Sequence, residues 1–142
     1  MKALAVLFFL LGVLAIMQRP TENDVETASI RGLAVNYAVY RNAAFLFAQA
    51  HKGFSGDIPL SSLNLPESWR ALRPWKARIE GRCCYVYGEA TPKEVEAVRR
   101  LFLGSFAVGL ASGGRIVPSL APHPVPVPSF IPDGNLVSVT EV

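Results

Sequence analysis

Residues 75–94 read WKARIEGRCCYVYGEATPKE and change from a strand pattern to a helix start. Apolar or aromatic side chains recur at every second position on both sides of Gly81. They are Trp75, Ala77 and Ile79 before the glycine and Cys83, Tyr85 and Tyr87 after it. An alternating pattern interrupted by a turn residue is typical of a β-hairpin. We therefore expect strands at 76–80 and 82–88.

A helix is expected directly after this hairpin. Thr91 is a favourable N-cap, Pro92 occupies the first helical position, and Glu94 follows three residues after the cap. The helix should end at Gly104. Its spacing predicts a core-facing side formed by Val95, Val98, Leu101 and Phe102, and a solvent-facing side formed by Lys93, Glu96, Arg99 and Arg100.

A long helix is predicted over residues 25–51. Thr21, Asn23 and Asp24 offer N-caps, and Gly53 provides a stop. Its main apolar stripe consists of Ile30, Leu33, Tyr37, Tyr40, Ala44 and Phe47, while Val35, Val39 and Leu46 lie on other sides. A helix that is apolar on several sides should need more than one partner surface.

The remaining segments contain many turn and proline residues. Three prolines within 54–75 predict an ordered loop with one helical turn at 67–72. Alternation within 106–117, around Gly-Gly, predicts a second hairpin. Six prolines within 118–132 favour extended backbone without a packed core of its own, and residues 135–142 are expected to add a last edge strand.

These elements predict an α+β fold. The order is an N-terminal hydrophobic helix, the long helix, a β-hairpin–helix–β-hairpin unit forming a small antiparallel sheet, and a proline-rich tail. With 142 residues the chain has room for one compact domain. We divide it into a membrane anchor or signal segment at 1–20, an α+β domain at 21–117, and the tail at 118–142.

Residues 3–17, ALAVLFFLLGVLAIM, contain no charge. As a helix they would be about 22 Å long, against about 30 Å of bilayer hydrocarbon, so the run lies between a secretory signal and a full membrane span. We favour a retained anchor, because apolar character continues past the cleavage site near Ala15. The expected location is the bacterial inner membrane, with a single N-terminal span and a periplasmic body. A cleaved periplasmic protein is the alternative.

Catalytic and ligand-binding groups are sparse. The two histidines are interpreted as structural or solvated residues, His51 at a helix C-terminus and His123 in a linker. Neither is placed for a triad, and the two cysteines lack the spacing of a metal site. The net charge is +3, but the lysines and arginines are scattered and do not form a continuous basic run, which argues against nucleic-acid binding. We expect no enzyme activity, no cofactor and no metal.

Cys83 and Cys84 are adjacent in the predicted strand, so their side chains should point to opposite faces, and a bond between them is disfavoured. Cys84 is expected in the core. Cys83, Tyr85 and Tyr87 share the other face and form a candidate partner surface. In an oxidising compartment Cys83 is a candidate for pairing with a second copy or another protein, so a homo-oligomer is one expectation.

The segments IPLSSLNLPESWRALRPWKARIEGRCCYVYGEA (58–90), SFAVGLASGGRIVP (105–118) and PSFIPDGNLVSV (128–139) together resemble the small PilM family of conjugative and type IVb pilus operons. This family is distinct from the actin-like ATPase of the same name. The resemblance covers residues 33–139. It implies a non-enzymatic envelope component in the biogenesis of a thin, type IV-like pilus, with other pilus assembly proteins as partners.

Two alternatives stay open. A minor pilin or pseudopilin also has a hydrophobic N-terminal helix leading into a helix-plus-sheet head, but the glycine and glutamate of a prepilin processing site are missing around residues 3–17. A secreted periplasmic hydrolase would require a nucleophile, base or metal set that the sequence does not present.

Overall fold

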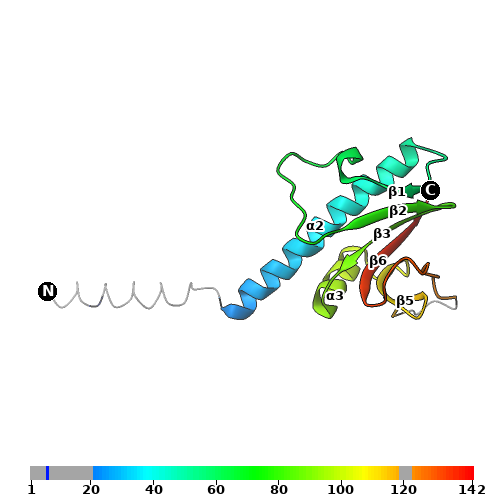
Figure 1. Ribbon diagram of the computed structural model, residues 1–142. Coiled ribbons are helices and arrows are strands. Elements are labelled where there is room, and N and C mark those ends of the chain that lie inside the picture. Colours follow the sequence, from blue (N-terminus) through cyan, green and yellow to red (C-terminus); the bar gives the residue numbers. More distant parts are fainter. Residues whose placement is uncertain (1–5, 7–20, 119–122) are drawn as a thin grey trace.

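The computed structural model describes residues 6, 21–118 and 123–142. In this part of the chain, two α-helices and a six-stranded antiparallel sheet form the predicted α+β fold (Figure 1). The hydrophobic helix expected at 3–17 lies outside the described residues. Within them, no helix has the length and apolar character that crossing a membrane requires.

The long helix α2 (Glu22–Ala50) begins three residues earlier than predicted. Its N-cap is Thr21, whose hydroxyl accepts from the Asp24 N–H at 3.3 Å, while an Asp24 carboxylate oxygen accepts from the Thr21 N–H at 3.1 Å. This reciprocal pair satisfies backbone donors that a helix start leaves free. The helix ends at Ala50 with His51 as its C-cap, within one residue of the predicted end.

The sheet contains both predicted hairpins. Its strands, in spatial order, are β1 (Gly56–Asp57), β2 (Lys76–Glu80), β3 (Cys83–Glu89), β6 (Asn135–Glu141), β4 (Val108–Ser112) and β5 (Arg115–Val117). The expectation of a C-terminal edge strand is wrong, because β6 lies between β3 and β4 and pairs with both. Its pairing with β3 spans seven residues, so the last segment of the chain joins the two hairpins into one sheet.

The second helix, α3 (Pro92–Leu101), has Thr91 as its N-cap and Pro92 as its first residue, as predicted. The helical turn expected at 67–72 is not formed, and a short 3₁₀-helix, η1 (Leu60–Ser62), lies earlier in the loop. The Asn36 side chain on α2 explains this difference. Its Nδ2 donates to the Arg70 carbonyl at 2.7 Å, and its Oδ1 accepts from the Leu72 N–H at 3.1 Å. The Leu72 N–H, which a helical turn would bond to the Ser68 carbonyl, is therefore not available for a helix.

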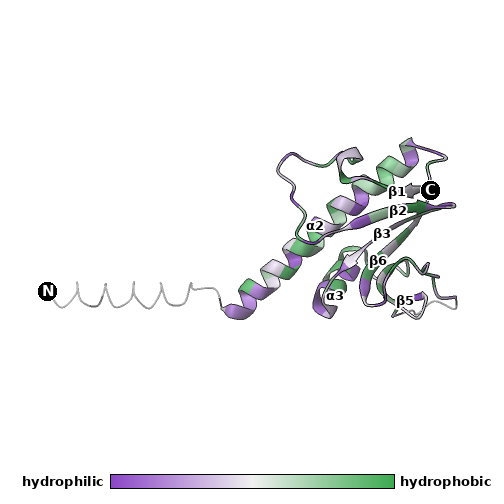
Figure 2. Cartoon of the chain, in the orientation of Figure 1, coloured by the Kyte–Doolittle hydropathy of each residue, from purple (hydrophilic) through white to green (hydrophobic). Residues whose placement is uncertain are grey.

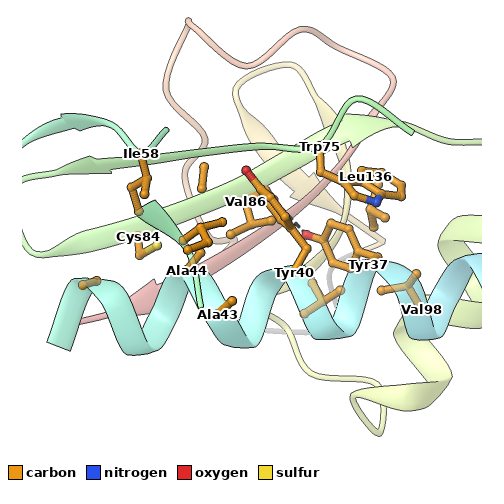
Figure 3. Close-up of a cluster of buried hydrophobic side chains, with 14 of the residues drawn as sticks. Tyr37, Tyr40, Ala43, Ala44, Ile58, Trp75, Cys84, Val86, Val98 and Leu136 are labelled. Carbon is orange, nitrogen blue, oxygen red and sulfur yellow. Dashed lines mark hydrogen bonds between the residues drawn. The ribbon is translucent and has the colours of Figure 1, made fainter. Parts of the chain in front are cut away.

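The main core lies between the helices and one face of the sheet (Figure 3). The Tyr37 hydroxyl is 2.8 Å from both the Val86 carbonyl oxygen and the Ser138 Oγ. A phenol has one proton, so the hydroxyl that donates to Val86 accepts from Ser138 in return. The packed residues include Leu33, Tyr40, Ala44, Trp75, Ala77, Ile79, Cys84, Val95, Val98, Val108 and Leu136.

The opposite face of the sheet is covered by the proline-rich segment, which was expected to have no packed core. Val127 and Ile131 are buried in a second cluster against this face. The Phe130 ring lies 5.7 Å from Tyr85 and 5.9 Å from Tyr87. Extended backbone can still present alternate side chains inward, as Val125 and Val127 do, and Phe130 and Ile131 complete this cluster. The strands are mixed in hydropathy (Figure 2), and charged and apolar residues alternate along β2 in the sequence KARIE.

Asn36→Ala is expected to lower the free energy of unfolding by about 1–3 kcal/mol. The substitution removes the acceptor of the Trp75 indole N–H, which lies 2.9 Å from Asn36 Oδ1, and both side-chain bonds to the loop. Urea denaturation measures the change. Ser29→Ala on the same helix is the control, because Ser29 is exposed and has no side-chain hydrogen bond among the described residues. Equal stability of the two variants would contradict the anchoring role.

Candidate functional site

The face predicted as a partner surface is covered by the chain itself. Tyr85 and Tyr87 are 9% and 7% exposed, because Phe130 packs on both rings. Cys83 lies on the same face and is half-buried, while Cys84 is buried on the helix side, in agreement with the alternation of a strand. Both thiols are free. Of the three predicted residues, Cys83 alone keeps substantial exposure, so this face offers little surface to another protein.

The histidines have the positions inferred from sequence. His51 follows α2, its Nδ1 lies 2.9 Å from the Phe47 carbonyl oxygen, and its ring stacks on Phe47 at 4.0 Å. His123 is exposed beside Pro124. Among the described residues, no three His, Cys, Asp or Glu side chains gather as a metal site would require. Within the described residues, neither histidine ring is hydrogen-bonded to a serine, threonine or cysteine side chain.

Glu94 is a buried carboxylate with a structural role. One of its oxygens accepts from the Thr91 N–H at 2.8 Å, and the other is 2.8 Å from Nη2 of Arg73. The first contact completes the N-terminal cap of α3. The second neutralises the charge and ties α3 to the loop before β2. Each oxygen has a structural partner, so the carboxylate links the start of α3 to the loop before β2.

A concave surface lies between α2 and α3, with a volume of about 680 Å³. We call it the α2–α3 groove. It is lined by Thr27, Ile30, Arg31 and Ala34 on α2 and by Pro92, Lys93, Glu96, Ala97, Arg100 and Leu101 on α3. The groove exists because the first turns of α2 extend beyond the sheet, so that α3 alone borders them on this side (Figure 1).

The groove has an apolar floor and a mostly basic rim. Arg31, Lys93 and Arg100 supply three cations, against the single carboxylate of Glu96. Lys93 pairs with Glu26 at 2.7 Å, and Arg100 is 3.5 Å from Glu96. Arg31 has no ion-pair partner among the residues that the structure describes. A surface of this kind suits an apolar segment that carries negative charge.

Leu101 shows how sequence reasoning missed the groove. Helical spacing predicted that Leu101 faces the core, yet it is 45% exposed and lines the groove. Leu101 lies on the side of α3 that faces α2. The side chains of α2 do not fill the space in front of it. The sequence does contain one indication of the groove. Apolar Ile30 and Leu101 each have a basic neighbour along the chain, and this combination is more typical of a contact surface than of a closed core.

Stability should fall at alkaline pH. Burial raises the pKa of Tyr40 and Tyr85 to about 12, and that of Cys84 to about 11, from ordinary values of 10.0 and 9.0. Burial also raises the pKa of Tyr37 and Tyr87. The unfolded chain thus releases these protons first, so stability is complete below about pH 9 and is lost as the pH rises toward 12.

Thermal unfolding at pH 7, 9 and 10.5 tests this dependence. We expect similar midpoints at pH 7 and 9 and a clear fall by pH 10.5, accompanied by tyrosinate absorption that appears only on unfolding. A midpoint that stays constant or rises from pH 9 to 10.5 would refute the burial of these groups.

Comparisons with known proteins agree with this fold. The PilM family model matches residues 6–139, so the chain belongs to the PilM family. This is the conjugative pilus family and not the actin-like ATPase. A crystal structure described as PilM from Escherichia coli B7A has a similar fold, with a TM-score of 0.59 and 21% identity, covering 86% of this chain and 99% of that one. A search of curated proteins gave no match.

Proposed function

We propose that this protein is a non-enzymatic envelope component of type IV, conjugative-type pilus biogenesis and acts through protein–protein contacts. Membership of the PilM family supports the connection to pili. The main support for a role in protein–protein contacts is the α2–α3 groove. It is open and largely apolar, has a volume of about 680 Å³, and has more basic than acidic side chains in its lining.

The occupant of the groove is a segment of another pilus assembly protein, with apolar side chains toward the floor and acidic ones toward the rim. Ile30, Ala97 and Leu101 offer the apolar contacts. Arg31 offers an unpaired guanidinium, which can bind a carboxylate through two parallel hydrogen bonds. Such complementarity favours an acidic partner over a basic one and speeds the encounter.

The protein is held at the inner membrane by residues 3–17, with its body in the periplasm. The uncharged run supports this location, and α2 begins only five residues after Met17. The groove is formed by the first turns of α2, so it would lie close to the membrane surface. There it could meet other membrane-bound assembly proteins.

The absence of catalysis is supported by the roles of the reactive groups. His51 closes α2, Glu94 caps α3, and Cys84 is buried with a raised pKa. Deletion of the gene should abolish piliation, and a plasmid carrying the wild type, His51→Ala or Cys83→Ser should restore it fully. Pili counted by electron microscopy and mating frequency measure this. If His51→Ala were present at the normal protein level but did not restore piliation, a catalytic role for His51 would be indicated. Normal piliation in the deletion strain would contradict a role in pilus assembly.

A minor pilin is the second candidate, because α2 packs lengthwise against an antiparallel sheet, as in the head of a pilin. The two proposals differ in where the protein is found. A minor pilin would be recovered in sheared, purified pili, whereas an assembly component would stay with the cell envelope.

A further inference from the structure

The side of α2 that faces away from the core carries a regular apolar strip. Its members follow the alternating spacing of three and four residues that defines a heptad repeat. They are Val25, Ala28, Gly32, Val35, Val39, Asn42 and Leu46, and we call them the outer seam. Over this span the seam is about 32 Å long. The sequence predicted a second partner surface for this helix.

Six of the seven seam residues are exposed among the described part of the chain, and Val39 alone is half-buried. Val25, Val35 and Leu46 are 57%, 48% and 52% exposed. An alanine-sized side chain at Gly32 would touch nothing within 4 Å. Leu72, held beside the helix by the bond from its N–H to Asn36, is 54% exposed and widens the strip. A surface helix normally has polar residues on this side, and contiguous apolar exposure usually marks an interface.

We propose that the outer seam binds the same seam of a second copy, so that two α2 helices lie parallel and in register. Heptad spacing with small residues at Ala28 and Gly32 allows the two backbones to approach closely. Asn42 is the single polar member of the seam. In a parallel, in-register pair each Asn42 meets its own counterpart, and the two amides can hydrogen-bond to each other.

The parallel direction rests on the proposed membrane anchor. Two copies whose residues 3–17 enter the same membrane have α2 helices that start on the same side, so an antiparallel pair is excluded. Confinement to one membrane also raises the effective concentration of the partner, which lets a narrow seam bind. The α2–α3 groove lies on the adjoining side of the helix, and Arg31 borders both the groove and the seam.

Cysteine cross-linking of the full chain in native membranes tests the dimer. In a Cys83→Ser background, Val35→Cys and Leu46→Cys should each form a disulfide-linked dimer on mild oxidation, while Cys84 stays unreactive because it is buried. Thr27→Cys is the control, since Thr27 is exposed on the groove side of α2. We expect at least tenfold more dimer from the seam positions than from position 27.

A second pair of variants tests the seam chemistry. With Val25→Cys as reporter, Val35→Glu should reduce the cross-link at least tenfold, and Thr27→Glu should leave it unchanged. No dimer from positions 35 and 46, equal dimer from position 27, or cross-linking of position 25 to position 46 would each overturn the proposal. Membrane fractionation separates the two claims: soluble protein would refute the anchor, whereas membrane-bound protein without cross-links would refute the dimer alone.

Discussion

Trp75→Ala is expected to lower the free energy of unfolding by about 3–5 kcal/mol. The indole is 7% exposed and meets the Tyr37 ring edge-on at 5.0 Å. A Cβ added at Gly88 would lie only 2.5 Å from the indole Cε3, which shows how tightly β3 packs on this ring. Truncation leaves a cavity between α2 and the sheet and also removes the donor that bonds to Asn36.

Leu72→Ala is the matched control for Trp75→Ala, because Leu72 lies in the same loop and is 54% exposed. We expect a change within about 0.5 kcal/mol for this variant. Urea denaturation followed by far-ultraviolet circular dichroism measures both. A loss below 1 kcal/mol for Trp75→Ala would mean that the loop before β2 is not part of the core.

The double substitution Arg31→Glu with Leu101→Asp is expected to abolish pilus assembly while the protein stays folded. Both residues are exposed and line the α2–α3 groove. Leu101→Asp removes an apolar contact, and Arg31→Glu replaces the cation that would attract an acidic partner with an anion that repels it. A loss of about 3 kcal/mol of binding corresponds to roughly a 100-fold weaker complex. Mating frequency and pilus counts in a complemented deletion strain measure the effect.

Leu103→Asp is the control for the groove, since Leu103 lies two residues beyond Leu101 on the chain, is 95% exposed and does not line the groove. It should support normal piliation. Thermal unfolding and immunoblots of all variants separate a lost contact from a lost protein. Normal piliation in the groove variant, or an equal defect in Leu103→Asp, would show that the groove is not the contact surface.

The parts of the fold that depend on local signals were predicted well. Alternation and turn residues gave β2 and β3, and the Thr91 cap gave the start of α3. The place of β6 was not predicted, because a strand pattern does not say which strand will pair with it. Its position between β3 and β4 depends on contacts between residues about fifty positions apart along the chain.

The covered face of the sheet illustrates the same limit. Alternation correctly separated Cys83 from Cys84, but it could not show that Phe130 would cover Tyr85 and Tyr87. Proline content indicated extended backbone and carried no information on where that backbone would pack. The groove was missed for a related reason, since helical spacing predicts which side of α3 is apolar and not whether α2 closes over it.

Photo-cross-linking from the floor of the groove tests the central claim most directly. A photoreactive amino acid replaces Ala97 in the full chain, in cells that still make pili, and the adducts are identified by mass spectrometry. We predict an adduct with a pilus assembly protein of the envelope, and its loss when Arg31→Glu and Leu101→Asp are added. Piliated cells in which position 97 gives no adduct with any pilus protein would contradict the account.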